Sequence, residues 1–237
     1  MSELLANETL TAVNDGIELI QNPDGLTFGT DAFLLSAFVR RTPHAVAAEF
    51  GSGSGIVSML LSKRNKLKHI DALEVQPYYA DLTRRNICHN RLDDRVEAVL
   101  CDVRELSREY DVIFSNPPYM KTESGKRNED DGKFAARHEV NGDIGDFCRA
   151  AARCLKYGGD FYAVYRPDRL IDLLAAMRDA AIEPKKFCFV HPDEAHKPCL
   201  LLVSGKRGGK VGCDVMRPLF LSSPDAARIY ETGDWAE

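Results

Sequence analysis

From Pro43 onward, short apolar runs alternate with segments whose apolar residues recur at helical spacing. The runs predict strands, and the segments between them predict helices at 78–91, 144–157 and 170–181, with a short helical piece ending near Glu109. The expected strands are 45–50, 70–75, 96–101, 111–115, 161–165, 187–190 and 199–203. Nearly continuous apolar strands separated by helices form a parallel sheet covered on both faces. No helix separates the last two runs, so they should pair antiparallel.

The sequence therefore predicts the α/β class, with a doubly wound, mostly parallel, seven-stranded sheet whose last strand is antiparallel. Ahead of the sheet, residues 17–28 should form a small hairpin around the turn Asn22-Pro-Asp-Gly25, followed by a helix capped by Thr30 or Asp31. We divide the chain into an N-terminal hairpin and helix extension packed on the core (1–43), one sheet domain (44–206) and a C-terminal tail (207–237).

The composition excludes several classes of protein. With 237 residues, 44% of them hydrophobic, the chain can bury one sizeable core, and its 28% charged residues and net charge of −5 indicate a soluble protein. No apolar stretch of about 18 residues exists, and the N-terminus lacks the pattern of a signal peptide. The seven cysteines form no C-x-x-C pair, which favours free thiols in a reducing cytosol, and the six histidines lack metal-ligand spacing. We expect a cytoplasmic protein with no metal and no membrane segment, as a monomer or weak dimer.

A glycine-rich turn follows the first predicted strand of the sheet, Glu49-Phe-Gly51-Ser-Gly53-Ser-Gly55. Glycines let backbone N–H groups approach a ligand closely. Position 56 is Ile rather than the third glycine of the dinucleotide fingerprint, and no Gly-Lys-Ser/Thr phosphate loop occurs. A plain tight turn remains the alternative for this segment taken alone.

Two carboxylates end the next two strands in order. Glu74 lies about twenty residues beyond the glycines, where an acid can accept hydrogen bonds from both ribose hydroxyls, and Asp102 closes the following strand. Each by itself is equally explained as a solvated loop acid or a helix cap. Their register with the glycine turn at the carboxyl edge of one sheet indicates a nucleoside site, because ligands of open α/β sheets bind outside that edge.

The tetrapeptide Asn116-Pro117-Pro118-Tyr119 follows the fourth strand. The Asn116 side-chain oxygen and the Pro117 carbonyl can both accept from one planar –NH₂ group, and proline fixes φ so that the carbonyl is held in place. Tyr119 can stack on a flat ring beside them. The pattern indicates a pocket for an amide or an amino-bearing base, although Pro-Pro also ends ordinary strands.

This set of motifs resembles the class I, Rossmann-like S-adenosylmethionine-dependent methyltransferases over residues 25–205, and the NPPY motif resembles the branch that methylates amino groups. Leu26-Thr-Phe-Gly-Thr-Asp31-Ala-Phe-Leu-Leu35 and Ala136-Arg-His-Glu139 are similar to the bacterial tRNA1(Val) adenine-37 N6-methyltransferases. The tail segments Gly205-Lys-Arg-Gly-Gly-Lys210 and Arg217-Pro-Leu-Phe-Leu221 also resemble members of that group. The resemblance implies N6-methylation of the adenine immediately 3′ of the anticodon, with S-adenosylmethionine as cofactor and a tRNA anticodon loop as partner.

The resemblance also implies the role of each site residue. Asn116, Pro117 and Tyr119 would be catalytic, and Pro118, Tyr119 and Arg137 would contact the substrate. The cofactor would be bound by Phe28, Thr30, Asp31, Glu49, Gly51, Gly53, Gly55, Glu74, Val75, Asp102, Val103 and Asn116, with Gly29 and its neighbours covering the methionine end. Within this set Glu74 would take the ribose and Asp102 the adenine amine.

RNA requires cations near the site. The 120–142 loop holds five basic and five acidic residues and, with Arg137, is expected to clamp the anticodon loop. Lys63, Arg64, Lys66 and Lys68 are interpreted as a solvated face. Lys206, Arg207, Lys210 and Arg217 should lie away from the active edge unless the tail folds back, because the last strand runs antiparallel.

Other functions carry parts of the same pattern. A protein-glutamine N5-methyltransferase also has NPPY but an additional N-terminal helical domain, whereas only about 43 residues precede this sheet. A ribosomal-RNA guanine-N2 methyltransferase often duplicates the domain, and a DNA adenine methyltransferase adds a target-recognition domain. A non-enzymatic RNA-binding module would not need Asn116 and Glu74.

Overall fold

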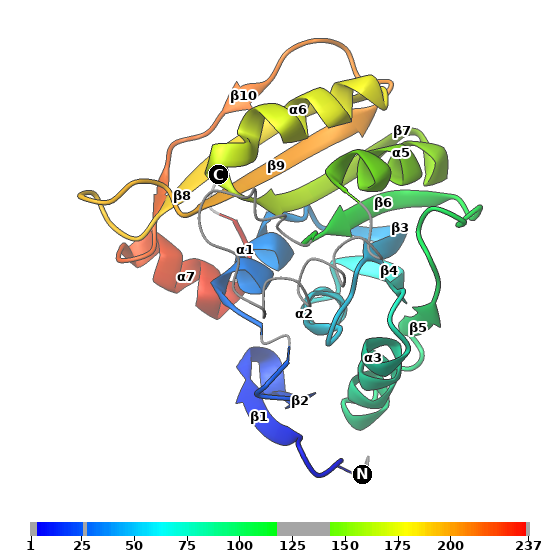
Figure 1. Cartoon of the computed structure of the whole chain (residues 1–237). Coiled ribbons are helices and arrows are strands. Elements are labelled where there is room, and N and C mark those ends of the chain that lie inside the picture. The colour runs from blue at the N-terminus through cyan, green and yellow to red at the C-terminus, as the bar shows by residue number, and fades with distance from the viewer. Residues whose placement is uncertain (1–3, 26–27, 118–142, 236–237) are drawn as a thin grey trace, which may run out of the picture.

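The computed structural model describes residues 4–25, 28–117 and 143–235 (Figure 1). Its helices are α1 (Thr30–Phe38), α2 (Ile56–Lys63), α3 (Pro77–His89), α5 (Ile144–Cys154), α6 (Leu170–Asp179) and α7 (Pro224–Thr232). An antiparallel hairpin consists of β1 (Thr9–Val13) and β2 (Ile17–Gln21). The central sheet contains β3 (Thr42–Phe50), β4 (Leu67–Glu74), β5 (Val96–Leu100), β6 (Tyr110–Ser115), β7 (Leu155–Tyr165), β8 (Ile182–His191), β9 (Leu200–Arg207), β10 (Asp214–Val215) and β11 (Leu219–Phe220).

The order of the strands in the sheet is β10-β8-β9-β7-β6-β3-β4-β5, with β11 paired to β8. Strands β3 to β7 pair in parallel, and β9 is antiparallel to both β7 and β8. The expected Rossmann-like class and the reversed last long strand are confirmed. In the part of the chain that the structure describes, the sheet has nine strands rather than seven, because the tail adds β10 and β11, two residues each, alongside β8.

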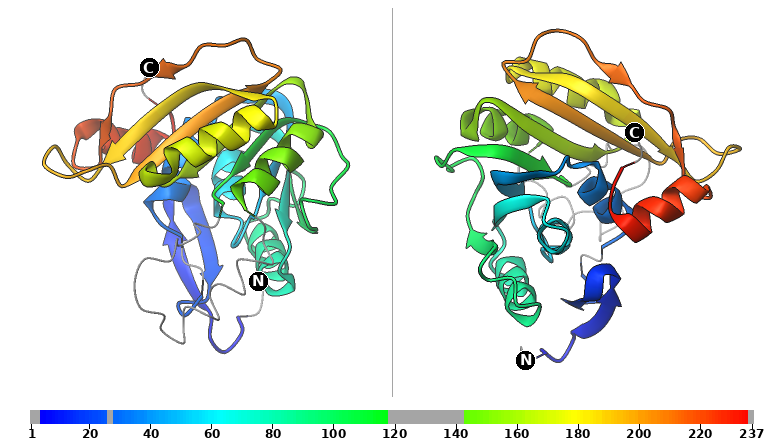
Figure 2. Two further views of the ribbon diagram at one scale, coloured as in Figure 1. Left: turned by 45° about the horizontal axis from the view of Figure 1, so that its top comes forward. Right: turned by 180° about the vertical axis from the view of Figure 1, so that it is seen from behind.

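Alternate residues of each strand enter two separate cores. In β6, Val112 and Phe114 pack with α1 and α2, whereas Ile113 packs with α5 and α6. The helices accordingly lie on two faces, α1, α2, α3 and α7 on one and α5 and α6 on the other (Figure 2). Burial on both faces explains why the strands are almost entirely apolar in sequence.

The N-terminal hairpin differs from the expectation. Strand β2 (17–21) lies within the predicted hairpin at 17–28, but it pairs with β1 at 9–13, which precedes it, and not across the turn at Asn22–Gly25. The turn is made by Asp15 and Gly16, both at positive φ, because this pair adopts the left-handed conformation that a tight hairpin requires. Two further local expectations were wrong. Gly29 rather than Thr30 or Asp31 is the N-cap of α1, and the segment before Tyr110 contains a turn instead of a helical piece.

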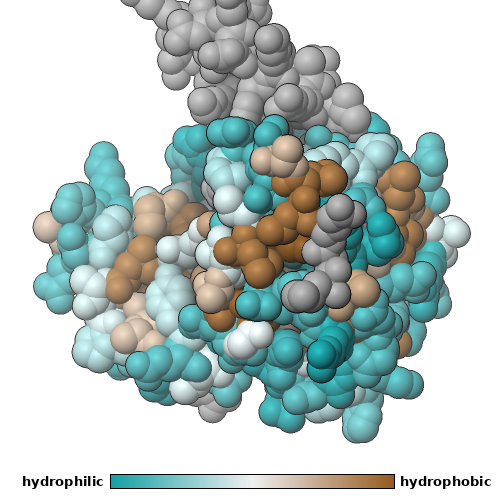
Figure 3. Space-filling view, turned by 90° about the horizontal axis from the view of Figure 1, so that it is seen from below, coloured by the Kyte–Doolittle hydropathy of each residue, from teal (hydrophilic) through white to brown (hydrophobic). Residues whose placement is uncertain are grey.

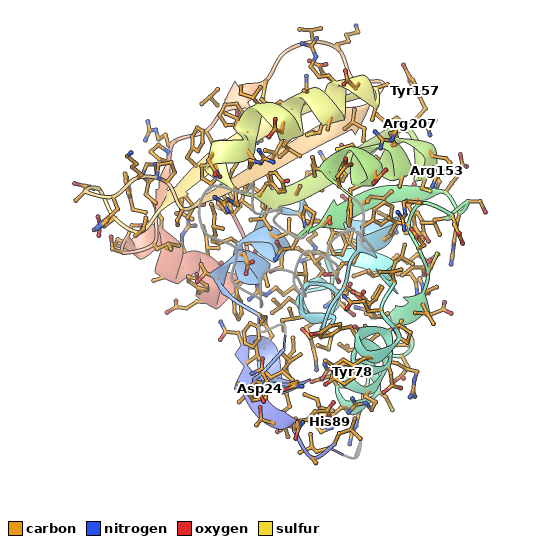
Figure 4. The ribbon with its side chains drawn as sticks, in the orientation of Figure 1. Asp24, Tyr78, His89, Arg153, Tyr157 and Arg207 are labelled. Carbon is orange, nitrogen blue, oxygen red and sulfur yellow. The ribbon has the colours of Figure 1, made fainter. Side chains whose placement is uncertain are left out.

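Two asparagines, Asn86 in α3 and Asn90 at its C-cap, hold the outer edge of β2. Asn86 accepts from the Ile20 N–H at 2.7 Å and donates to the Ile20 carbonyl at 2.9 Å, and Asn90 repeats this pattern with Glu18. Residues four apart on a helix rise about 6 Å, close to the advance of two residues along a strand. The asparagine amides therefore take the place of a neighbouring strand. Figure 4 labels Tyr78 and His89, which lie at the two ends of α3 where it faces the hairpin.

The C-terminal tail folds back along the sheet. Arg207 lies at the edge where β7 begins, beside Tyr157 (Figure 4), and its guanidinium donates to the Leu155 carbonyl. The chain then runs parallel to β8, with Phe220 opposite His191 at the strand's end, and α7 packs against α1. The tail thus returns towards the carboxyl edge of the sheet.

Two of the cations expected on a solvated face are instead buried by this tail. Lys66 is 3% exposed and donates to the carbonyls of Ser36, Ala37 and Val39 at the end of α1. Arg64 pairs with Asp15 at 2.7 Å. The sequence alone did not indicate that the C-terminal end of α1 would place its free carbonyls around Lys66.

All seven cysteines are free thiols. Cys148, Cys154 and Cys188 are buried, Cys101 is half-buried, and Cys88, Cys199 and Cys213 are exposed. Seen from the side of the hairpin, the face is mainly polar with apolar side chains gathered in its middle (Figure 3). Among the residues described, no helix has the length and apolar character needed to cross a bilayer.

Candidate active site

The glycine turn after β3 has the conformation that its sequence indicates. Gly51, Gly53 and Gly55 have φ of 74°, 56° and 78°, which side-chain-bearing residues rarely adopt. The N–H groups of Gly51 and Ser52 both donate to the Leu73 carbonyl at 2.9 Å, which ties the turn to β4. A Cβ at Gly53 would meet no atom within 4 Å, so the space beside this residue is open to a ligand.

Helix α3 supports the glycine turn from the other side. The Thr83 hydroxyl donates to the Gly53 carbonyl at 2.8 Å, and the Asn86 amide donates to the Ser54 carbonyl at 3.0 Å. A Cβ at Gly55 would approach the Thr83 Cγ2 to 2.8 Å, so this glycine is required by close packing. Sequence reasoning missed Thr83 and Asn86, because their partners are backbone carbonyls distant along the chain.

Glu74 is 5% exposed and faces the same turn. Its Oε2 accepts from the Gly53 N–H at 3.1 Å and its Oε1 from the Gln76 N–H at 2.9 Å. Burial raises the pKa of the Glu74 carboxyl, although these backbone N–H groups oppose the shift. The structure therefore places this acid directly beside the open glycine.

Glu49 faces the helix that follows the turn. Its Oε2 accepts from the Ser58 N–H at 3.1 Å and from the Ser58 hydroxyl, in the first turn of α2. Complete burial, reinforced by the charge of Glu74, raises the Glu49 pKa to about 8. The Glu49 carboxyl thus accepts from a backbone N–H in the first turn of α2, where N–H groups have no partner within the helix.

Asp102 lies just beyond β5, on the neighbouring strand of the same edge. Arg104 pairs with it through the guanidinium at 2.5 Å and through the backbone N–H at 2.9 Å. The Arg104 guanidinium lowers the pKa of the Asp102 carboxyl, keeping it ionised. An incoming amino group would share this carboxylate with Arg104.

Asn116 follows β6 and contacts the N-terminal extension. Its Nδ2 donates to the Asp31 Oδ2 at 2.7 Å, and the Asp31 Oδ1 accepts from the Ala32 N–H at 2.9 Å. A carboxylate only accepts, so the amide must turn its nitrogen towards Asp31, which places its oxygen on the opposite side. This pair joins residues 85 positions apart and fixes an acceptor at the carboxyl edge of β6.

The remaining candidate residues divide into two groups. Pro117 and Val103 are buried, Val75 and Thr30 are half-buried, and Phe28 packs edge-on against Phe33 at 5.8 Å. Pro118, Tyr119 and Arg137, with the 120–142 loop, lie outside the described residues.

One cluster elsewhere has metal-ligand atoms. The donor atoms of His69, Asp71 and Glu97 lie within 4.8 Å of one another among the residues described. Asp71 is already bonded to Arg108 and Tyr110, each at 2.7 Å, and to His69 at 3.1 Å. These contacts explain the cluster as an internal polar network.

Comparison with known proteins gives the family. The model of the methyltransferase small domain matches residues 23–174, which is more than half of the chain. The chain belongs to the methyltransferase small domain family. The resemblance of the motifs to methyltransferases is thereby confirmed.

Similar curated proteins are named tRNA1(Val) (adenine(37)-N6)-methyltransferase. One from Flavobacteriaceae bacterium (strain 3519-10) is 30% identical over 110 residues, 46% of this chain and 48% of that protein. One from Phocaeicola vulgatus is 27% identical over 184 residues, covering 75% of this chain and 76% of that protein. The chain thus matches about half the length of the first relative and three quarters of the second.

Solved structures share the fold. A predicted O-methyltransferase from Agrobacterium tumefaciens has a TM-score of 0.70 at 19% identity, covering 87% of this chain and 98% of that one. Trm5 of Methanocaldococcus jannaschii in complex with adenosine has a TM-score of 0.60 at 18% identity, covering 88% and 57%. At these identities the likeness establishes the class I methyltransferase fold alone.

Proposed function

We propose that this protein transfers the methyl group of S-adenosylmethionine to N6 of an adenine in tRNA, adenine 37 of tRNA1(Val). The observation that carries the proposal is the Asn116–Asp31 pair, which orients an amide oxygen at the strand edge that also holds the glycine turn. The family and the names of the curated relatives support the same reaction.

The residues of the glycine edge fit the proposed cofactor. Open space beside Gly53, the buried Glu74 carboxylate and the ionised Asp102 match the backbone, ribose and adenine-amine contacts of an adenosyl group. When bound, S-adenosylmethionine supplies an electrophilic methyl group on a sulfonium. Glu49, by contrast, would act on α2 through Ser58 rather than touch the cofactor.

Asn116 and Pro117 would position the reacting amine. The N6 lone pair of adenine is delocalised into the ring, which makes this nitrogen a weak nucleophile. Two acceptors on its hydrogens, the Asn116 oxygen and the Pro117 carbonyl, favour a pyramidal nitrogen whose lone pair faces the methyl. This is preorganised electrostatic stabilisation, and no strong base is required because the proton can leave after attack.

Contacts with the RNA complete the proposal. Tyr119 would stack on the base once it is rotated out of the anticodon loop, with Pro118 beside it. Arg137 and the 120–142 loop would clamp the anticodon loop. An enzyme with this substrate would work in the cytoplasm, and the monomer or weak dimer expected from the sequence remains part of the proposal.

The deciding experiment replaces Asn116 by Ala. We expect methyl transfer to unmodified tRNA to fall by about 10²-fold or more, while cofactor affinity measured by calorimetry stays close to that of the wild type. Asn14→Ala makes the same chemical change at an exposed hairpin residue and should leave activity intact. Near-full activity of Asn116→Ala would refute the assigned role.

The product identifies the substrate class. Incubation with radiolabelled cofactor and total tRNA from a strain lacking the gene, followed by digestion, should place the label in N6-methyladenosine. Label in N2-methylguanosine or in protein would instead indicate one of the two rival methyltransferase functions.

A further inference from the structure

A large groove lies between the folded-back tail and the sheet. Its volume is about 1230 Å³, and its floor is formed by β7, β8 and β9 next to the C-terminal end of α1. Residues 214–219 and the end of the tail, with Trp235, form its outer wall. No helix lies between β8 and β9 to cover this part of the sheet face, and the tail with α7 bridges it instead.

The charge of the groove is opposite to that of the whole protein. Seven cationic side chains and four carboxylates line it, although the chain carries a net charge of −5. Apart from the buried Lys66, the cations are Arg40, Arg41, Lys185, Lys186, Lys206 and Arg217. Such a concentration in an acidic protein raises the local density of anions.

Three of these cations are available to a ligand. Arg41, Lys186 and Arg217 are exposed, and no hydrogen bond or ion pair of their side chains occurs among the described residues. Other cations of the groove are engaged, since Lys206 pairs with Asp160 at 2.7 Å and Lys185 donates to the carbonyls of Lys210 and Gly212. The groove is therefore held open by internal contacts while three charges face solvent.

The groove lies at the opposite edge of the sheet from the proposed reaction site, and α1 connects the two. Helix α1 carries Asp31 at its first turn and Arg40 and Arg41 just beyond its last turn. Nine helical residues extend about 14 Å, so Asp31 and the groove arginines lie about that far apart along α1. An RNA stem extending from a target base at Asn116 would have to cover this distance to contact the groove.

We propose that this tail groove binds the phosphate backbone of the RNA stem next to the target nucleotide, through Arg41, Lys186 and Arg217. The inference rests on the proposed function and adds a second RNA contact, on the opposite end of α1 from the Asn116 amide. These residues position the RNA and carry no sequence preference, because phosphate contacts are independent of base identity.

The test compares two triple variants. The groove variant removes the three groove charges and carries Arg41→Gln, Lys186→Gln and Arg217→Gln. The control variant removes three exposed charges elsewhere and carries Lys68→Gln, Arg84→Gln and Arg91→Gln. Affinity for an unmodified tRNA anticodon stem-loop is measured over salt concentrations from about 50 to about 300 mM. We expect the groove variant to bind the stem-loop at least about tenfold more weakly than the wild type. The slope of log affinity against log salt concentration should be smaller in magnitude by about three, and the control variant should resemble the wild type in both measurements.

Kinetics separates the two proposals. The groove variant should show a raised KM for the stem-loop and a kcat near that of the wild type, because its residues do not touch the reacting amine. If the wild type methylates the stem-loop, RNA binding in the groove would be refuted by unchanged affinity and salt dependence of the groove variant. An equal loss of affinity in the control variant would refute it as well. Absence of methyl transfer to any RNA by the wild type would instead refute the proposed function.

Discussion

At the scale of single residues, the chemistry depends on which atom a side chain presents. The Asn116 amide has a nitrogen that donates and an oxygen that accepts. The Asp31 carboxylate accepts from the nitrogen at 2.7 Å and so fixes the orientation of the amide. Sequence alone suggested that Asp31 covers the methionine end of the cofactor. In the structure its Oδ2 accepts from the Asn116 amide nitrogen, so Asp31 also has a proposed role in orienting that amide.

Asp31→Asn distinguishes these two roles. An amide at position 31 can present either nitrogen or oxygen to Asn116, so the orientation of the Asn116 amide is no longer enforced. We expect kcat to fall on the order of ten- to a hundredfold, the loss of one charge-assisted hydrogen bond, with little change in cofactor affinity. A large rise in the cofactor Kd with kcat unchanged would favour the covering role.

Glu49 predicts a pH dependence of stability. Burial keeps a proton on its carboxyl up to about pH 8, whereas the unfolded chain releases it near 4.5. The folded state therefore binds more protons between these values, and the free energy of unfolding falls as pH rises from about 5 to about 8. Glu49→Gln should flatten this decline in denaturant unfolding, and exposed Glu194→Gln should preserve it. An unchanged slope in Glu49→Gln would contradict the raised pKa.

At the scale of elements, α3 organises both the hairpin and the glycine turn. Its Asn86 bonds to Ile20 on one side and to the Ser54 carbonyl on the other. The helix thus connects the N-terminal extension with the proposed cofactor site. The fold depends on side-chain amides here because β2 would otherwise leave its outer backbone groups unpaired.

Asn86→Ala should destabilise the protein by about 2–5 kcal/mol, since a buried N–H and two buried carbonyls lose their partner. Asn90→Ala is the comparison, and its smaller effect follows from the partly exposed position of its contacts with Glu18. Urea unfolding measures both. Equal losses would show that the two amides are equivalent and that the link to Ser54 contributes little.

At the scale of the whole molecule, the tail is part of the core. Tyr230 packs on Phe33 at 5.5 Å, Trp235 on Phe38 at 5.2 Å, and Ile229 is buried. Arg64 and Lys66 lie beneath this segment, from the opposite end of the domain in sequence. Closure of the tail over the sheet creates the groove that we assign to RNA.

Gly233→Ala tests this closure. Gly233 ends α7 at φ 70°, and a Cβ there would overlap the Arg64 guanidinium. Gly158 has a similar φ of 79°, and a Cβ there would meet no atom within 4 Å, so Gly158→Ala suffers only the backbone strain of about 1–2 kcal/mol. Gly233→Ala should lose about 1–3 kcal/mol more in urea unfolding. Equal losses would mean that Arg64 moves aside without cost.

Much of the fold and part of the site were predictable because their causes are local. Nearly continuous apolar runs predicted the strands, apolar residues at helical spacing predicted the helices, and the glycines predicted a tight turn, which the structure forms at positive φ. The hairpin partner was missed although Asp15-Gly16 is a strong turn signal, and the buried roles of Lys66 and Arg64 were missed because charge alone suggested solvent. Contacts between segments far apart in sequence leave no periodic trace.

By itself, the sequence determined the class of the sheet, the order of the candidate groups along its carboxyl edge and the family motifs, because these follow from local patterns and from strand direction. Only the tertiary structure decided which way the Asn116 amide faces, that α3 braces the glycine turn, and that the tail returns over β8 to enclose a cationic groove. The physical reason is that each of these features is a pairing of polar groups across long sequence separations. Such pairings are chosen by packing, after the local elements have formed.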